Sequence, residues 1–266
     1  MAKRSKPTQE MPTGALSRQK RLTLGLFVNS LEGGYQNALL QGVEELARER
    51  DVNVLCFVGG ELRPAGLPAD PGNVFYDFLA KDNVDGLIIA SGAIGTLVSL
   101  DTMRAFCERF CPLPQASIAL PITGVPSVLL DNYAGMRAVV QHLVEVHGYR
   151  RIVYVRKQEG HAEDDARFNA YTDVLAEHGI AVDPNLIVPG TCYSVPETGL
   201  RLLFDERRLQ PHRDIEAIVV TDDSVALAIL DGLQARGIRV PDDVALAGLD
   251  DVEESRYVTP PLTTAR

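Results

Sequence analysis

Short apolar runs rich in β-branched residues alternate along this chain with longer segments of helical period, and this alternation restricts the fold more than any other feature. Residues 22–28, 53–58 and 84–90 are such runs, and residues 36–50 carry apolar side chains at helical spacing. Near-continuous apolar strands separated by helices are typical of a parallel sheet that helices cover on both faces. The sequence therefore predicts an α/β protein.

The alternation occurs twice along the chain. The first series adds a helix at 96–110 and ends with two short strands at 116–120 and 127–130. The second series alternates helices and strands, at 132–147, 151–156, 163–178, 186–189, 195–209, 217–221, 223–236 and 244–249. Two such series predict two doubly wound parallel-sheet lobes joined by a hinge near residues 128–131.

These patterns divide the chain into an N-terminal lobe at 22–128, a C-terminal lobe at 129–256 and a crossover strand at 257–266. The sequence stops soon after Pro260 and Pro261, with no further strand or helix in the pattern. We therefore expect the N-terminal lobe to be incomplete, with its closing segment absent, and the chain to be a fragment of a longer product.

The formal net charge of −10 is unevenly distributed. Residues 1–21 carry six basic side chains and one acidic one, which gives +5 for this segment and −15 for the rest. An acidic body argues against nucleic-acid binding by the folded part, because the phosphate backbone is bound by basic surfaces. We expect residues 1–21 to be a disordered basic tail, with contact to nucleic acid or to an acidic partner as the alternative.

The sequence also indicates in which cellular compartment the protein resides and whether it binds a metal. No apolar stretch is long enough to span a bilayer, and the basic tail lacks the apolar core of a secretory signal. The cysteines form no C-x-x-C pair and have no metal-type spacing to the histidines: Cys56, Cys107, Cys111 and Cys192. We expect a cytoplasmic protein with reduced thiols, no membrane partner, no metal and no cofactor.

Catalytic motifs are missing from the sequence. It contains no nucleophile elbow, no P-loop, no zinc-protease motif and no dinucleotide fingerprint after the first strand. Gly33 and Gly34 follow a strand and precede a helix, so they could aim amides at an anion, but we favour a plain loop. The pattern does not support an enzyme.

Polar side chains follow three strands of the second series, where open α/β sheets bind ligands. Asp131, Asp222 and Asp250 each follow a predicted strand, and we expect them to converge on one cleft. The alternative for each is a helix cap or a charge in the first turn of a helix, and we favour that alternative for the neighbouring Asp223 and Asp251. Arg167 stands among acids at a helix start, against the preference of the helix dipole, which predicts either a polar or anionic partner or a solvated surface position.

Several motifs resemble the LacI/GalR repressor family. Residues 237–251 read GIRVPDDVALAGLDD and are followed by Pro260-Pro261-Leu262-Thr263-Thr264, which is similar to the family signature around the last strand of its second lobe. Residues 131–135, DNYAG, resemble the entry into that lobe, and Arg167 followed by Tyr171 resembles the family's ligand-binding arginine and aromatic. The resemblance extends over about residues 22–264.

The resemblance implies the fold of type I periplasmic binding proteins and a small polar ligand in the cleft. It implies ligand contacts by Asp131, Arg167, Asp222 and Asp250, with an aromatic face from Tyr35 in the other lobe. The implied effector is a sugar, polyol, amino sugar or nucleobase, and the implied assembly is a homodimer formed through the first lobe.

Three positions depart from the family pattern. Asp222 stands where the family has asparagine, Leu249 where it has phenylalanine, and Ala170 where glycine is common. Three carboxylates against one arginine predict an acidic cleft suited to a donor-rich polyol, an amino sugar or a cationic ligand. The alternative is that Asp222 pairs with Arg167 in the empty site.

Residues 1–21 are too short and too polar for the helix-turn-helix that begins repressors of this family. We therefore expect a small-molecule sensing domain of a bacterial regulatory or signalling protein, which acts by ligand-induced lobe closure and can be fused to an output domain. DNA binding by this chain is not expected. The alternative is a LacI-type DNA-binding regulator with a missing or atypical DNA-binding part.

Overall fold

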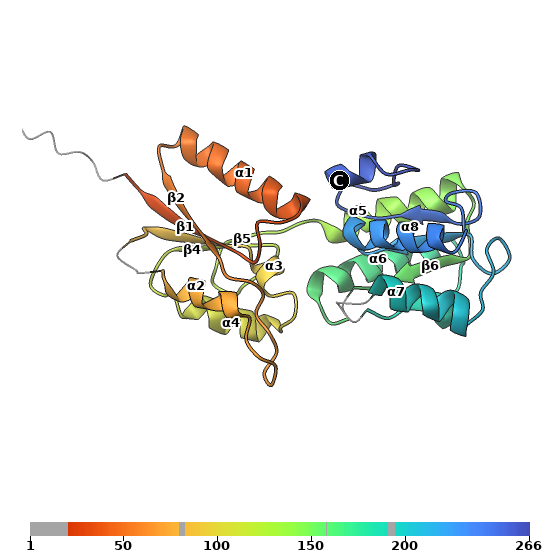
Figure 1. The fold of residues 1–266 in the computed structure, drawn as a ribbon, viewed down its shortest axis with the longest axis horizontal. Helices are drawn as coiled ribbons and strands as arrows, with labels where there is room; N and C mark the ends of the chain where they lie inside the picture. The colour runs from red at the N-terminus through yellow and green to blue at the C-terminus, as the bar shows by residue number, and fades with distance from the viewer. Residues whose placement is uncertain (1–20, 80–82, 158, 191–194) are drawn as a thin grey trace, which may run out of the picture.

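The computed structural model describes residues 21–79, 83–157, 159–190 and 195–266, which form two α/β lobes, each built on one parallel sheet (Figure 1). The predicted fold class is confirmed. Of the predicted basic tail, all but Arg21 lies outside the described residues, and so does Cys192.

The first lobe contains a five-stranded parallel sheet in the order β2-β1-β3-β4-β5. Its strands are β1 (Thr23–Val28), β2 (Asn53–Val58), β3 (Gly86–Ile89), β4 (Gln115–Ile118) and β5 (Ser127–Val128). Its helices are α1 (Gly34–Glu49), α2 (Val74–Asp77), α3 (Ser91–Ile94) and α4 (Leu100–Glu108), with a short 3-10 turn η1 (Pro71–Asn73) before α2.

Alternation along β1 divides the core of this lobe between the two sheet faces. Phe27 packs with Tyr76, Phe106 and Phe110 on the face that α2 and α4 cover, with ring centroids 4.8–6.2 Å apart. Leu26 and Val28 point to the opposite face, beneath α1 (Figure 1). Successive side chains of a strand point to opposite faces, so one apolar run fills both cores.

The second lobe contains a four-stranded parallel sheet in the order β7-β6-β8-β9. Its strands are β6 (Ile152–Val155), β7 (Ile187–Val188), β8 (Ala217–Val220) and β9 (Ala245–Ala247). Its helices are α5 (Asn132–Gln141) with the wider turn η2 (His142–Val146), α6 (Ala162–Glu177), α7 (Val195–Leu200) with η4 (Arg201–Glu206), and α8 (Asp223–Ala235); η3 (Pro184–Leu186) and η5 (Glu253–Arg256) are 3-10 turns.

All residues of β6 and β8 are buried, because helices cover both faces of their sheet. Val153 and Val155 face the core under α7 and α8, whereas Ile152 and Tyr154 face the core under α5 and α6. This is why both strands are apolar without interruption.

Two segments of the chain lie on the side of the second lobe that faces the first. The chain passes from the first lobe to the second between β5 and α5, and its C-terminus lies on the side of the second lobe that faces the first (Figure 1). Residues 263–265 continue the second sheet: the amides of Gly248 and Asp250 each donate a 2.9 Å bond, to the carbonyls of Thr263 and Ala265 respectively.

Some predicted boundaries were wrong. The helix expected at 96–110 is shorter and corresponds to α4, which begins at Leu100 because the Ser99 hydroxyl caps it by accepting from the Thr102 amide at 3.3 Å; a separate short helix, α3, precedes it and was not predicted. The strand expected at 127–130 ends at Val128. Within the described ranges, no helix combines the length and the apolarity needed to cross a membrane.

Candidate ligand-binding cleft

A cleft of about 880 Å³ lies between the two lobes and is lined by both. The first lobe contributes the start of α1, Glu61 and residues at and after α3, and the second lobe contributes the starts of α5, α6 and α8 and the ends of β8 and β9. Pockets for small molecules have volumes of about 300–1,000 Å³. All five predicted site residues line this cleft: Tyr35, Asp131, Arg167, Asp222 and Asp250.

The topology of the second lobe explains why polar groups gather here. Lys157 follows β6, Asp222 follows β8, and Asp250 follows β9, three neighbouring parallel strands that end at the same edge of the sheet. Ligands of open α/β sheets bind at this edge, outside the carboxyl ends of the strands.

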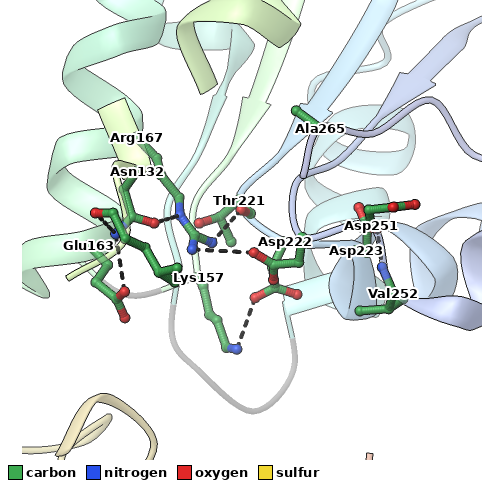
Figure 2. A network of polar contacts seen from close by, with 12 residues as sticks. Asn132, Lys157, Glu163, Arg167, Thr221, Asp222, Asp223, Asp251, Val252 and Ala265 are labelled. Atoms are coloured by element: carbon green, nitrogen blue, oxygen red, sulfur yellow. Dashed lines mark hydrogen bonds and ion pairs between the residues drawn. The ribbon is translucent and has the colours of Figure 1, made fainter. Parts of the chain in front are cut away.

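Arg167 lies at the centre of this edge and is only 7% exposed. Its Nε donates to Asn132 Oδ1 at 2.7 Å, and its Nη1 donates to the Thr221 carbonyl at 2.7 Å (Figure 2). Its Nη2 lies 3.5 Å from Asp250 Oδ1. The position of Arg167 among the acids of α6 is therefore explained by partners on α5, β8 and β9, since a buried charge has to be paired and hydrogen-bonded.

Asp222 is 5% exposed and has two structural partners. Its Oδ1 caps α8 by accepting from the Val225 amide at 2.9 Å, and its Oδ2 accepts from Lys157 Nζ at 2.9 Å (Figure 2). Burial acts to raise the pKa of Asp222, but Lys157 and the Val225 amide outweigh it and lower that pKa. The alternative that Asp222 pairs with Arg167 was wrong, since Lys157 takes that place.

Asp223 lies in the first turn of α8, as predicted, although Asp222 caps that helix, whereas Asp251 neither caps η5 nor lies in its first turn. Asp223 is fully buried and accepts from the Thr264 hydroxyl at 2.8 Å, the Ser255 hydroxyl at 2.9 Å and the Val252 amide at 3.2 Å. It therefore binds the segment after β9 and the last residues of the chain to the start of α8. Asp251 pairs with Arg256 at 2.6 Å, which lowers the pKa of the Asp251 carboxyl.

Asp250 has the most perturbed carboxylate of the cleft. Burial raises its pKa to about 7; Arg167 and Lys157 oppose the rise, and the negative charges of Asp222 and Asp223 add to it. The side chain is still 34% exposed, so it is open to the cleft. Its backbone has φ of 118°, a conformation that costs energy for a residue with a side chain.

Asp131 and Tyr35 complete the predicted set. Asp131 Oδ1 accepts from the Ala134 amide at 3.0 Å, so this residue caps α5 and also lines the cleft. Tyr35 stands in the first turn of α1 and is 37% exposed. Burial raises the pKa of its hydroxyl, and the negative charges of Glu163 and Asp250 raise it further; the residue lines the cleft from the first lobe.

Several polar residues of the cleft were not predicted from the sequence, among them Asn132, Lys157, His161 and Glu163. Asn132 donates from its Nδ2 to Glu163 Oε1 at 3.1 Å while it accepts from Arg167, so it joins the two side chains. The Nε2 atom of His161 is buried and has no hydrogen-bond partner among the described residues, and burial lowers the pKa of its ring. Asn132 could have been found, because it follows Asp131 in the DNYAG motif.

The cleft is suited to binding polar groups through hydrogen bonds. It offers carboxylate oxygens, a guanidinium, an ammonium, an imidazole and an aromatic ring from elements of both lobes. Among the described residues, no group of three or more histidine, cysteine, aspartate or glutamate side chains is arranged to hold a metal ion.

Comparisons with known proteins agree with this architecture. The model of the family described as "Periplasmic binding protein-like domain" matches residues 140–266. The HTH-type transcriptional repressor ExuR of Bacillus subtilis is 25% identical over 97% of this chain and 73% of its own length. The repressor PurR of Haemophilus influenzae is 25% identical over 91% of this chain and 68% of its own length.

Solved structures of transcriptional regulators are similar to this chain over most of its length. A LacI-family transcriptional regulator from Sanguibacter keddieii superposes with a TM-score of 0.72 at 28% identity, covering 91% of this chain and 82% of that one. The complex of the transcriptional regulator CelR with cellobiose has a TM-score of 0.72 at 25% identity, covering 92% of this chain and 72% of that one.

Fold and cleft together define a two-lobed protein of the periplasmic-binding-protein type. The predicted resemblance is confirmed: in sequence and in fold the chain is similar to the effector-binding core of LacI-family regulators. The relatives named above are regulators, not enzymes.

Proposed function

We propose that this chain is the small-molecule sensing domain of a bacterial regulatory protein, with a sugar-like or otherwise polar effector held between its lobes. The observation that carries the proposal is the cleft, in which Arg167, Asp222 and Asp250 of one lobe face Tyr35 of the other. That one similar structure is a transcriptional regulator in complex with cellobiose supports a polar, sugar-like effector.

The proposed mechanism is closure of the lobes on the ligand. Glu254 and Glu163 of the second lobe approach two glycines of the first: a β-carbon on Gly34 would lie 3.4 Å from Glu254 Oε2, and one on Gly92 would lie 3.3 Å from Glu163 Oε2. The lobes therefore meet at both rims of the cleft. A ligand that contacts both lobes favours this closed arrangement, and a near-complete switch requires about 5.5 kcal/mol of differential affinity.

The proposed role is binding without turnover, in the cytoplasm, with transcription as the regulated process. The relatives named as transcriptional repressors support this assignment. We do not assign DNA contact to the two lobes, because the body of the chain carries a formal charge of −15 and phosphate repels such a surface.

We also propose that the chain forms a homodimer through its first lobe. Helix α1, which lies wholly within the described range 21–79, has no buried residue, and Leu46 on it is 52% exposed. Strand β2 beside it is a sheet edge with Leu55 43% exposed. An apolar helix face next to an open edge suits an isologous contact, and light scattering of wild type and Leu46→Glu tests it.

A thermal-shift screen of sugars, polyols, amino sugars and nucleobases tests the sensing function. A ligand at about 100 times its Kd adds about 2.7 kcal/mol to the free energy of unfolding. We expect at least one compound to raise the Tm of the wild type and to lose that effect with Arg167→Met, while Arg137→Met, a surface substitution of the same type on α5, keeps it. A hit that both variants keep would place binding outside the cleft.

A further inference from the structure

Two of the five histidines lie side by side on the exposed surface of the second lobe. His142 is the first residue of the wider turn η2, which continues helix α5, and His147 follows that turn. The Nε2 atoms of the two rings are 3.1 Å apart, and the ring planes meet at 84°. Helix α5 begins at the cleft, whereas the pair lies at the other end, roughly 20 Å away because a helix rises about 1.5 Å per residue. The pair is therefore separate from the ligand-binding cleft.

The backbone of η2 brings the two rings together. In an α-helix, residues five positions apart point about 140° away from each other, so their spacing in the sequence predicts no contact. The turn η2 is π-helical, with backbone bonds between residues five apart, and it places such residues one above the other. Tyr149 stacks on the ring of His147, with centroids 5.3 Å apart and planes at 13°, and holds that ring in place. Turns of this kind within helices are frequent at functional sites.

The distance between the two Nε2 atoms fits a shared metal ion. Two nitrogens that bind one ion at about 2.0–2.1 Å are about 2.9 Å apart at a right angle and about 3.3 Å apart at the tetrahedral angle. The 3.1 Å between His142 and His147 lies between these two values. Two neutral rings at this distance share one proton between their Nε2 atoms. To bind an ion, the donor ring moves that proton to its Nδ1 atom through solvent, and both Nε2 lone pairs then face the ion.

From this geometry we infer that His142 and His147 together bind one divalent transition-metal ion. The ions that prefer imidazole nitrogen are Cu²⁺, Ni²⁺ and Zn²⁺. The pair lies at the C-terminal end of a helix, where the negative end of the helix dipole also favours a cation. Two protein ligands leave the remaining coordination positions to water or to a donor from another molecule. The inference is independent of the proposed function, because neither histidine lines the cleft.

Isothermal titration of the full chain with NiCl₂ tests the inference. The thiols are first blocked with iodoacetamide, because Cys56 and Cys111 are exposed and thiolates bind the same ions. We expect one Ni²⁺ ion per chain, tighter binding of Cu²⁺ and weaker binding of Mn²⁺, the usual order of these ions.

His142→Gln and His147→Gln locate the ion. Each should weaken Ni²⁺ binding by about 10-fold or more, because the loss of even an outer-shell partner of a metal ligand costs about 10- to 100-fold. Both side chains are exposed, so the fold should survive, and urea denaturation checks this. His212→Gln is the matched control, because this histidine is also exposed and its imidazole contacts Asp243 instead of another histidine. The control should bind Ni²⁺ as the wild type does.

Electron paramagnetic resonance of the Cu²⁺ complex counts the nitrogen ligands. The wild type should show two imidazole nitrogens, and each of the two single variants should show one.

Three results would overturn the inference. Failure of the wild type to bind Ni²⁺ at millimolar concentration contradicts a metal site. Unchanged binding in both His142→Gln and His147→Gln places the ion elsewhere on the chain. A single imidazole nitrogen in the wild-type spectrum shows that the two rings form only a hydrogen-bonded pair. In each case the proposed function stands, since effector binding in the cleft is measured separately.

Discussion

Replacing Arg167 by methionine should destabilise the second lobe more than any surface substitution of the same kind. Methionine has a similar length and is apolar, so it fills the buried volume and removes the guanidinium alone. It leaves Asn132 Oδ1 and the Thr221 carbonyl without the donor that each has at 2.7 Å. It also removes the cation that opposes the raised pKa of Asp250.

The size of the loss follows from these contacts. A hydrogen bond to a charged group contributes about 1.5–3 kcal/mol, and Arg167 makes two short ones while 7% exposed. The contact with Asp250, at 3.5 Å, adds little, because that carboxyl can take up a proton instead. We therefore expect a loss of about 3–5 kcal/mol, within the range for breaking a buried pair.

Urea denaturation followed by circular dichroism measures this loss, and Arg137→Met is the control. Arg137 binds Glu177 through two bonds, at 2.9 and 2.6 Å, but the Glu177 side chain is 49% exposed. An exposed pair of this kind contributes about 0–1 kcal/mol. Equal losses for the two variants would refute the view that the Arg167 cluster organises the second lobe.

Three further predictions concern single side chains of the cleft. Asp222→Ala should lower the free energy of unfolding by about 1–2 kcal/mol because α8 loses its cap, whereas Asp222→Asn keeps a capping oxygen and should lose less; equal losses in urea denaturation would contradict the capping role. Gly92→Ala should lower the free energy of unfolding by about 1–3 kcal/mol, because the new β-carbon would lie 2.6 Å from that of Ala119. Gly42→Ala, a control in α1 with open space around it, should raise the free energy of unfolding by about 0.5–1 kcal/mol in the same assay. Asp250→Asn should raise the Tm of the ligand-free protein at pH values above about 7, the pKa of Asp250 in the folded state. Because this carboxyl pKa is raised on folding, the wild type loses stability as the pH rises from the usual 3.8 through about 7, and the variant does not. A gain in Tm as large near pH 4 as near pH 8 would contradict this.

The sequence predicted the second sheet well because its central strands, β6 and β8, are buried on both faces. An uninterrupted apolar run such as 152–155 has few other interpretations, and the helical segments between such runs leave a parallel sheet as the consistent choice. The convergence of Asp222 and Asp250 followed from the same reasoning, since parallel strands end at one edge. Whether these residues contact a ligand stays a prediction.

The roles of adjacent acids could not be predicted in the same way. Asp222 and Asp223 are neighbours of identical type, and only the backbone at the start of α8 decides that Asp222 caps the helix while Asp223 points into the protein. The choice of Lys157 over Arg167 as the partner of Asp222 depends on contacts between residues 65 positions apart. Such pairings need the fold first.

Hydrogen exchange with and without the compound that gives the largest thermal shift tests most directly whether a ligand binds between the two lobes. We expect slower exchange in both lobes at once: in the first turn of α1 around Tyr35, and in the segments that follow β8 and β9, around Asp222 and Asp250. Protection confined to one lobe, or found only away from these segments, would contradict a ligand held between the two lobes.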